Sequence, residues 1–306
     1  MIAFFANLFG YVLNFLYEVC NNYGVAIILF SIIVKFLMLP LAVKQHKTVK
    51  KTNKLQNEMK QIQFKYRNNP EKMNQEMSDL YKRENMSPLS GCLSSIIQII
   101  LLFAVFYLVR APLTYMEKIE PNAINEMKKV IQQDENANIN TGYPEIAIIK
   151  YAREHMDVNA ESEESVSEEE NVFVKNKDKL DLNMDFFGID LSKVAKDDLS
   201  DWKVLIIPVL YVISSFISMK LTTVKQEKKK ENLITDGKEQ HEEMADAMAD
   251  TNKMMSWMMP IMSISIACIA PLGLALYWLM NNILMIVEKI VIDKFLKDEE
   301  EATKNV

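Results

Sequence analysis

Four long stretches of this chain carry almost no charge, and they limit what it can fold into. Residues 89–109, 204–219 and 254–287 contain no charged residue, and residues 25–43 contain one, Lys35. About 20 apolar helical residues cross the roughly 30 Å hydrocarbon layer of a bilayer. The mean hydropathy is −0.03, because charged connections separate the apolar stretches. The sequence therefore excludes a soluble globular protein.

The last apolar stretch is too long for one span. Pro271 and Gly273, both turn-forming residues, interrupt it near its middle. We therefore expect two helices there and five spans in all. The stretches do not alternate with the period of two that barrel strands show, so the spans should be helices. The predicted spans are residues 23–43, 89–110 and 202–222, followed by 254–270 and 274–292 within the region 254–292.

The distribution of basic residues predicts the orientation, because cytosolic loops carry an excess of Lys and Arg. Connection 44–88 has 11 basic and 5 acidic residues, whereas connection 111–201 has 10 basic and 21 acidic residues. Lysines are also frequent early in 223–253. We expect 44–88, 223–253 and the tail 293–306 in the cytosol, and 111–201 and the N-terminus outside. The protein would then be a multi-pass protein of a bacterial cell membrane.

Residues 1–22 are apolar but lack the basic start and the cleavage site of a signal peptide. Polar residues recur there at spacings of four and three, which puts one polar stripe on an otherwise apolar helix. We expect an amphipathic helix lying on the outer membrane interface, and a sixth span is the alternative. The stripe consists of Asn7, Tyr11, Asn14, Glu18 and Asn21.

Connection 44–88 predicts two helices separated at Asn68-Asn69-Pro70, because proline disfavours helix at the residue before it. Apolar residues recur on both arms, so the simpler interpretation is a helical hairpin that seals its own apolar stripe. Methionine-rich surfaces also repack around varied apolar partners, which would suit transient contact with emerging hydrophobic chains or with ribosomal RNA. The methionines concerned are Met59, Met73, Met77 and Met86.

Connection 111–201 is long and acidic. Its run 161–170 contains six glutamates and is expected to be solvated and disordered. Stretches 122–133 and 144–156 are candidates for short helices, and residues 186–189 could dock at the outer interface. The expected fold is an all-α polytopic membrane protein, with a five-helix transmembrane bundle, a cytosolic helical hairpin and an amphipathic N-terminal interfacial helix.

Motifs for enzymatic chemistry are absent from the sequence. It has no phosphate-binding loop, no nucleophile elbow and no zinc-protease motif. His46, His155 and His241 fall in different connections, and Glu288 lies near the cytosolic end of the fifth span. We therefore expect no enzyme, no metal site and no cofactor.

Lys35 is the exception within the apolar stretches. It lies about eight residues, roughly 12 Å, from the cytosolic end of its span. A lysine at a helix centre costs roughly 2.5–3.5 kcal/mol to insert. The simpler interpretation is a partly snorkelled lysine. The functional one is a solitary charge that faces a water-filled cavity in the bundle. Polar residues that could line such a cavity are Ser31, Ser94, Ser95, Gln98, Ser214, Ser215, Ser218, Ser263 and Ser265.

Several motifs resemble those of the YidC membrane protein insertase family, and the resemblance covers all five spans. Two departures indicate a divergent, Gram-positive-like member. Lys35 stands where the family usually has arginine, and Ser94 stands where it tends to have proline. The motifs are 22–29 (NYGVAIIL), 34–41 (VKFLMLPL), the basic hairpin, 90–93 (SGCL) with Gln98, 187–191 (FGIDL), 259–262 (MPIM) and 271–282 (PLGLALYWLMNN).

The resemblance implies a groove that is open to the cytosol and to lipid, is closed on the outside, and carries Lys35, with Trp278 also in its lining. Polar flanks of nascent membrane proteins would pass through this groove while their apolar spans enter lipid. The implied partners are nascent membrane proteins, the lipid bilayer, the ribosome and the general secretion channel, with no small-molecule substrate. The alternative is a small solute channel or transporter, which would need a through-going polar path and usually internal repeats. A structural assembly factor is a third interpretation that the sequence does not separate from the first.

Overall fold

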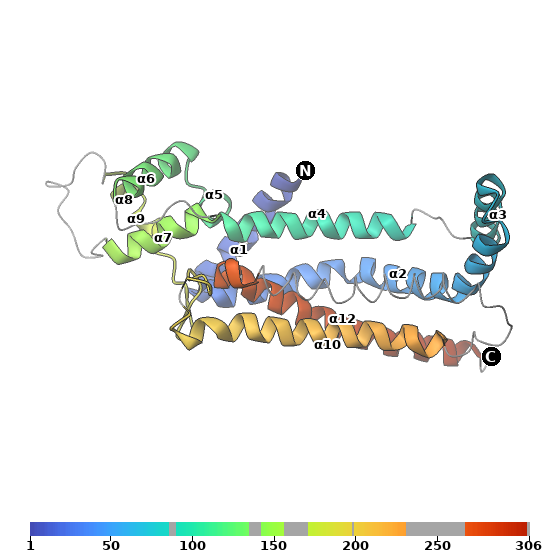
Figure 1. Cartoon of the computed structure of the whole chain (residues 1–306). Helices are drawn as coiled ribbons and strands as arrows, with labels where there is room; N and C mark the ends of the chain where they lie inside the picture. The colour runs from blue at the N-terminus through green and yellow to red at the C-terminus, as the bar shows by residue number, and fades with distance from the viewer. Residues whose placement is uncertain (86–89, 135–141, 156–170, 198, 231–266, 305–306) are drawn as a thin grey trace. The chain divides into compact units, whose positions relative to one another are not determined.

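The computed structural model of this chain describes residues 1–85, 90–134, 142–155, 171–197, 199–230 and 267–304, and these are mostly helical (Figure 1). The chain divides into two compact units. Unit 1 consists of residues 1–2, 34–103 and 288–306, and unit 2 consists of residues 3–33 and 104–287. Three long helices contribute residues to both units: α2 (Tyr23–Lys65), α4 (Ser90–Arg110) and α12 (Leu272–Lys304).

Helix α2 is longer than the predicted first span. It runs unbroken through Pro40 for 43 residues, or about 65 Å at 1.5 Å per residue, which is about twice the thickness of the hydrocarbon layer. Proline removes one backbone hydrogen bond, and helices in lipid tolerate this where neighbouring groups compensate. The span predicted at 23–43 and the arm predicted to follow it therefore form one continuous helix, and the point at which that helix leaves the membrane stays a prediction.

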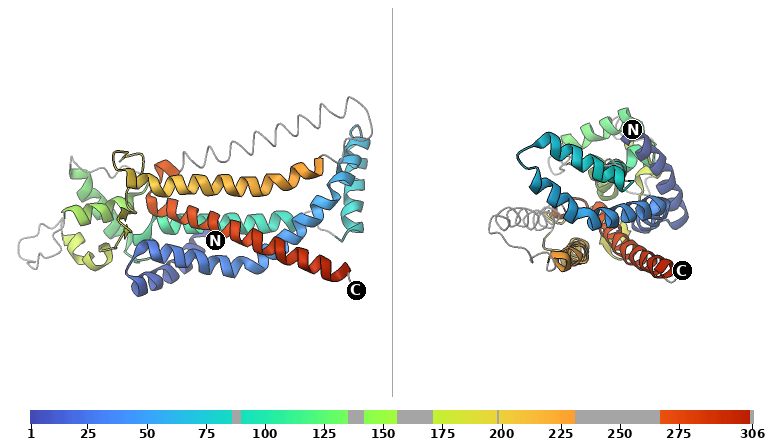
Figure 2. Two further views of the ribbon diagram at one scale, coloured as in Figure 1. Left: turned by 90° about the horizontal axis from the view of Figure 1, so that it is seen from below. Right: turned by 90° about the vertical axis from the view of Figure 1, so that its right-hand side faces the viewer.

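Helix α3 (Pro70–Arg83) runs back along the end of α2 in unit 1 (Figure 2). The side chain of Asn69 caps α3 by accepting a hydrogen bond from the backbone N–H of Lys72, at 3.1 Å. Proline in the first turn suits a helix start, because its missing N–H would have no partner there. Leu55 on α2 and Leu80 on α3 are buried. The polar contacts between the two arms are Tyr66–Glu76, Arg83–Glu58 and Lys51 with the carbonyl of Glu84.

Unit 2 contains the remaining elements. Figure 1 shows its helices α6 to α9 gathered together. The elements are α1 (Ile2–Cys20), which begins in unit 1, α5 (Pro112–Tyr115), α6 (Pro121–Gln133), α7 (Pro144–His155), α8 (Asn171–Lys175), α9 (Lys177–Leu180), β1 (Asp185–Phe186), β2 (Ile189–Asp190), η2 (Trp202–Leu205) and α10 (Ile206–Lys230).

Helix α1 packs tightly against the segment that follows α5. A methyl group on Gly10 would overlap the carbonyl oxygen of Tyr115, so the two backbones meet where only glycine fits. Lys118 donates a hydrogen bond to Oδ1 of Asn7 at 2.9 Å. Its ammonium also lies 4.3 Å from the ring centroid of Tyr11. Part of the predicted polar stripe of α1 therefore binds a lysine of connection 111–201.

Connection 111–201 contains ordered helices with a buried face. Helices α6 and α7 confirm the two short helices expected at 122–133 and 144–156. The acidic run 161–170 lies outside the described residues. The carboxylate of Glu145 is buried and accepts hydrogen bonds from the backbone N–H and the hydroxyl of Thr114, at 2.9 and 2.6 Å. Apolar side chains buried in α6 and α7 are Ile124, Met127, Ile131, Ile146, Ile148 and Ile149.

Residues 185–190 form a short antiparallel hairpin of β1 and β2. Asp185 pairs with Asp190, and Phe186 pairs with Ile189. The turn needs positive φ at Phe187 (52°) and Gly188 (78°). This backbone conformation leaves the Phe187 side chain 89% exposed at the tip. Docking of this hairpin at the outer interface stays a prediction.

The described residues fit an all-α polytopic membrane protein. Predicted spans 23–43, 202–222 and 274–292 each fall on a helix that is long and apolar enough to cross a bilayer, whereas 254–270 lies almost entirely outside the described residues. Helix α1 also meets the length and hydropathy requirement, so the sixth-span alternative remains beside the interfacial one. The five-helix count therefore stays a prediction. The candidate spans are Ile2–Cys20, Tyr23–Leu55, Trp202–Leu221 and Leu272–Phe295, with a shorter apolar helix at Ile96–Arg110.

Candidate functional site

The sequence predicts that Lys35 is a solitary charge, but in the structure it forms an ion pair. Its Nζ lies 2.8 Å from Oε2 of Glu288 on α12. The other carboxylate oxygen of Glu288 lies 3.9 Å from Nε2 of His46. The Lys35 side chain is 23% exposed and that of Glu288 is 9% exposed. The three residues belong to unit 1, and we call them the Lys35–Glu288–His46 cluster.

This ion pair explains how an apolar helix can hold a lysine. A charge removed from water is costly unless an opposite charge accompanies it. Removing one partner of a fully buried pair costs about 3–5 kcal/mol, because the other charge is left uncompensated. Partial exposure of Lys35 lowers that cost through solvent screening. The prediction that Lys35 is a solitary charge is therefore wrong. Lys35 and Glu288 form an ion pair, and His46 lies beside it.

Gln98 takes part in a different helix contact. Its side-chain amide donates a hydrogen bond to Oε1 of Gln45 at 2.7 Å and so links α4 to α2 within unit 1. Gln45 follows Lys35 by ten residues, or about 15 Å along the helix. Gln98 is exposed. Ser94 and Ser95 belong to α4, but their side chains lie outside what the structure describes.

Ser31 is a packing residue. Its side chain is buried, and its hydroxyl donates to the carbonyl of Ile27 at 2.7 Å, one turn earlier in α2. Serines bonded to their own helix are common in membrane proteins and need no cavity. The expectation that Ser31 presents its hydroxyl to a water-filled cavity therefore has no support in its contacts.

Ser215 and Trp278 lie where α10 meets α12 in unit 2. Asn282 donates to the hydroxyl of Ser215 at 2.8 Å and approaches that of Ser214 at 3.4 Å. The rings of Tyr211 and Trp278 have centroids 6.0 Å apart. Side-chain amides that bond across helices stabilise helix pairs in lipid. Both predicted residues thus take part in a helix–helix contact. Ser263 and Ser265 lie outside the described residues.

Two residues that form these contacts, Glu288 and Asn282, were not predicted as site residues. Glu288 is the one acidic residue between positions 254 and 292. It lies near the same end of its span as Lys35, which was the available signal for pairing the two charges. Asn282 had a weaker signal, since an asparagine in an apolar helix often bonds to a neighbouring helix.

Three of the motifs that carry the family resemblance, 22–29, 187–191 and 271–282, meet in unit 2. The side chain of Asn22 donates to the carbonyl of Asp185 at 2.6 Å, and a methyl group on Gly24 would overlap the ring of Phe186. The backbone N–H of Gly273 donates to the carbonyl of Leu191 at 3.0 Å. The start of α2, the β hairpin and the start of α12 are therefore locked together.

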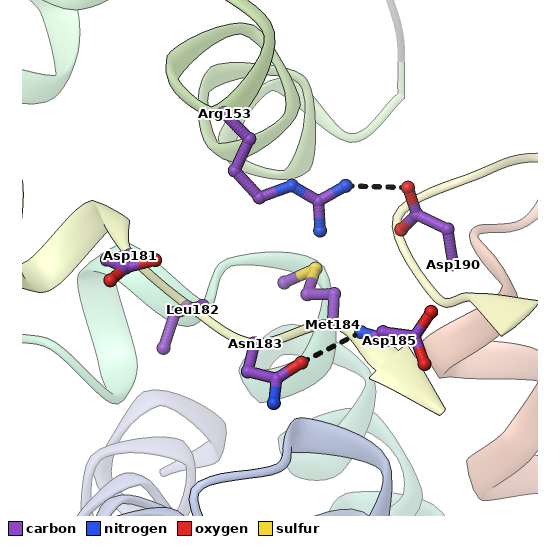
Figure 3. Close-up of a pocket in the computed structure, with 7 residues that line it drawn as sticks. All are labelled: Arg153, Asp181, Leu182, Asn183, Met184, Asp185 and Asp190. Carbon is purple, nitrogen blue, oxygen red and sulfur yellow. Dashed lines mark hydrogen bonds and ion pairs between the residues drawn. The ribbon is translucent and has the colours of Figure 1, made fainter. Parts of the chain in front are cut away.

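A cavity of about 350 Å³ lies beside the hairpin in unit 2 (Figure 3). Figure 3 shows Arg153 pointing across it toward Asp190, and the two side chains form an ion pair at 2.6 Å. Burial alone would raise the pKa of Asp190, but hydrogen bonds from Ser192 and the charge of Arg153 hold that pKa below its usual value. The pair ties α7 to β2 and is structural. Among the described residues, no group of three or more His, Cys, Asp or Glu side chains could hold a metal ion.

The methionines of the α2–α3 arms support the simpler interpretation. Met59, Met73 and Met77 are half-buried, in the same region as the buried Leu55 and Leu80. Met86 lies outside the described residues. Contact of these methionines with clients or with the ribosome stays a prediction.

Comparisons with known proteins give a consistent result. The family model of the 60Kd inner membrane protein matches residues 15–300. The protein named membrane protein insertase YidC of Chlorobaculum parvum is 27% identical over 291 residues, which are 95% of this chain and 36% of that protein. The protein of the same name from Clostridium perfringens is 42% identical over 92 residues, which are 30% of this chain and 39% of that protein.

A third relative shows where the similarity is concentrated. The protein named membrane protein insertase YidC of Chloroherpeton thalassium is 43% identical over 100 residues, 33% of this chain and 17% of that protein. Identity is therefore much higher over short stretches than over the whole chain. The chain spans about a third of the length of the relatives that it matches along most of its own length.

Proposed function

Because this chain belongs to the 60Kd inner membrane protein family, we propose that it inserts nascent membrane proteins into a bacterial membrane. The observation that carries the proposal is the match of the family model over residues 15–300. Relatives that align with 95% and 94% of this chain have names that describe an insertase and not a chemical reaction. The candidate membrane-spanning helices suit a multi-pass protein that works within the bilayer.

The proposed route is a hydrated groove open to the cytosol. Polar flanks of a client would pass through it near Lys35, while the apolar span moves sideways into lipid. Burial of apolar surface releases about 25 cal/mol per Å², so no nucleotide is required. The membrane potential adds about 2.3 kcal/mol per 100 mV for each acidic charge that moves outward. In unit 1, the residues proposed to line the groove are Lys35 and Gln98.

Lys35 would attract acidic flanks. Two opposite charges 4 Å apart gain about 4 kcal/mol at an effective dielectric constant of 20. In unit 1, Glu288 already forms such an ion pair with Lys35. The net gain from a client carboxylate is therefore the difference between two similar contacts, which is much smaller than the gross value.

The proposed partners are nascent membrane proteins and lipid. The ribosome and the general secretion channel are further candidates. The basic α2–α3 arms, which carry most of the 11 basic residues of connection 44–88, suit contact with ribosomal RNA. Orientation with the N-terminus outside follows from the same charge asymmetry.

Site-directed photocrosslinking to a stalled nascent membrane protein tests the proposal. A photoreactive amino acid at position 35 or 98 should form adducts with the polar flank of the client. The matched control is position 36, since the adjacent Phe36 is 70% exposed on a different face of the same helix. Equal adduct yields at positions 35 and 36 would contradict a groove along the Lys35 face.

The solute channel is tested with the purified protein in liposomes. The insertase proposal expects no ion or small-solute flux above that of empty liposomes, together with insertion of an added single-span client. Flux without insertion would favour the channel and overturn the proposal.

A further inference from the structure

The Lys35–Glu288–His46 cluster places one carboxylate between two nitrogen groups. Oε2 of Glu288 lies 2.8 Å from the ammonium of Lys35, and Oε1 lies 3.9 Å from the imidazole of His46. The carboxylate is nearly buried, whereas both nitrogen-bearing side chains are about a quarter exposed. Water or a bound chain therefore reaches Lys35 and His46 more readily than it reaches Glu288.

The ion pair changes what the site can attract. Lys35 and Glu288 together carry no net charge, so a client meets a neutral pair. A carboxylate from a client can take the place of Glu288 at the ammonium without a change in the number of ion pairs. A neutral polar flank offers no charge to compensate Lys35, so it cannot replace Glu288 in the same way.

His46 offers the displaced carboxylate a second partner. When Glu288 leaves Lys35, its charge would otherwise be stranded in a nearly buried position, which is costly. In its protonated form, the imidazole of His46, whose Nε2 lies 3.9 Å from Oε1, can take up that charge after a small side-chain rotation. Exchange of partners can then occur without an unpaired charge at either end.

We propose that Glu288 is a resident counterion that occupies the client position at Lys35, and that acidic flanks enter by displacing it toward His46. Glu288 is thus a specificity-determining residue. It lowers the affinity for acidic flanks, whose carboxylate must take its place, and it does not exchange with flanks that carry no charge. This inference rests on the proposed insertase function, since it concerns how that function selects its clients.

The test uses the full-length protein in liposomes and two single-span clients. The clients differ only in their translocated flank, which carries either aspartates or the matching asparagines. Glu288→Gln should insert the acidic client about fivefold faster than the wild type, the factor that corresponds to a partly exposed ion pair. The rate for the neutral client should not change. The matched control, Asp293→Asn, removes a negative charge from the same helix five residues later and should leave both rates unchanged.

A second variant keeps the proposal testable if Glu288→Gln does not fold. Glu288→Asp retains the charge but withdraws it by one methylene, so it should give a smaller increase for the acidic client. His46→Gln should slow the acidic client alone, because the displaced carboxylate loses its second partner.

Failure of this inference differs from failure of the proposed function. Equal rates for the wild type and the Glu288 variants, or equal changes for both clients, would overturn the counterion role while insertion itself stands. A wild-type protein that inserts neither client would overturn the insertase proposal and the inference with it.

Discussion

Each of the two units of this protein is stabilised internally by a different kind of contact. In unit 2, buried apolar side chains from α1, α2, α4, α6 and α7 share the interior with backbone hydrogen bonds between distant segments. In unit 1, polar contacts between helices, as in Lys35–Glu288, Gln98–Gln45 and Arg83–Glu58, stand beside a small apolar cluster of Ala42, Val43 and Ile292. Close apolar packing resists rearrangement, whereas partly exposed polar pairs can change partners at modest cost.

This difference suggests that the two units have different roles. Unit 2 fixes the starts of α2 and α12 through the interlocked motifs around Gly24, Phe186 and Gly273. Unit 1 contains charges that can exchange with those of another chain. A protein that handles varied clients needs both a rigid frame and a region with low-cost alternatives. Each prediction below perturbs one unit and asks whether the other responds.

The largest effect is expected in the frame, from Gly10→Ala. Alanine normally stabilises a helix by about 1 kcal/mol relative to glycine. Here its methyl group would overlap the backbone carbonyl of Tyr115, which cannot rotate away. We expect a net loss of about 3 kcal/mol, measured as a lower midpoint of thermal unfolding in detergent. The control is Gly142→Ala, because no atom lies within 4 Å of that position's Cβ. An unchanged midpoint for Gly10→Ala would mean that α1 is not packed as described.

The next effect is functional and belongs to unit 1. Lys35→Ala should slow insertion of a client with an acidic flank about tenfold, the factor equivalent to 1.4 kcal/mol, because the cation is lost and Glu288 is left without its partner. Lys35→Arg should retain most of the rate, since it keeps the charge. The midpoint of thermal unfolding of Lys35→Arg should also stay near that of the wild type. Equal insertion by Lys35→Ala and the wild type would remove the electrostatic role of this residue.

A smaller effect is expected where α10 meets α12. Asn282→Ala removes the hydrogen bond to Ser215 and should lower the stability by about 1 kcal/mol. Insertion should be little affected if the contact is part of the frame. The same truncation one residue earlier, Asn281→Ala, serves as the control in thermal unfolding. A large loss of insertion with unchanged stability would instead place Asn282 in the client route.

The smallest effect is a pH dependence of unit 2. Burial raises the pKa of Glu117 to about 7; the charge of Lys179 opposes this and that of Glu18 adds to it. The folded protein holds this proton more tightly than the unfolded chain, whose glutamate titrates near 4.5. The stabilising contribution is therefore fully present below pH 4.5 and is lost as the pH rises through about 7.

Because Glu117 is partly exposed, we expect about 1 kcal/mol or less between the two limits. Glu117→Gln should reduce the loss of thermal stability between pH 5 and pH 8, whereas Glu120→Gln, at an exposed position, should not. A wild-type curve that Glu117→Gln leaves unchanged would assign the pH dependence to other groups.

Local patterns predicted the parts of the fold that depend on neighbouring residues. The apolar stretches gave the long helices, Pro70 marked the start of α3, and the stretch expected at 122–133 forms α6. Helix α2 continues through Pro40, as the predicted span 23–43 implied. Proline is a strong break signal in water, but helix neighbours in a membrane protein can offset its missing hydrogen bond.

The candidate site was only partly readable from the sequence. Lys35 was predicted as a site residue because a charge within an apolar stretch can be recognised from the sequence alone. Its pairing with Glu288 joins residues 253 positions apart, and it depends on the rotation of two helices about their axes. Ser31 shows the opposite case, since its polar side chain suggested a cavity, whereas its hydroxyl bonds to its own helix.

The motifs of this chain resemble those of the insertases. Hydropathy and charge along the chain were enough to predict that this protein is helical and crosses a membrane. These properties follow from the free-energy cost of leaving polar groups unpaired in hydrocarbon. Each segment avoids that cost through its own composition and its own helical hydrogen bonds. The tertiary structure alone decided which charges neutralise one another and which glycines touch a backbone, because such contacts depend on the relative placement of segments that no local pattern encodes. Lys35 illustrates both: the sequence identified the charge, and the fold supplied its partner.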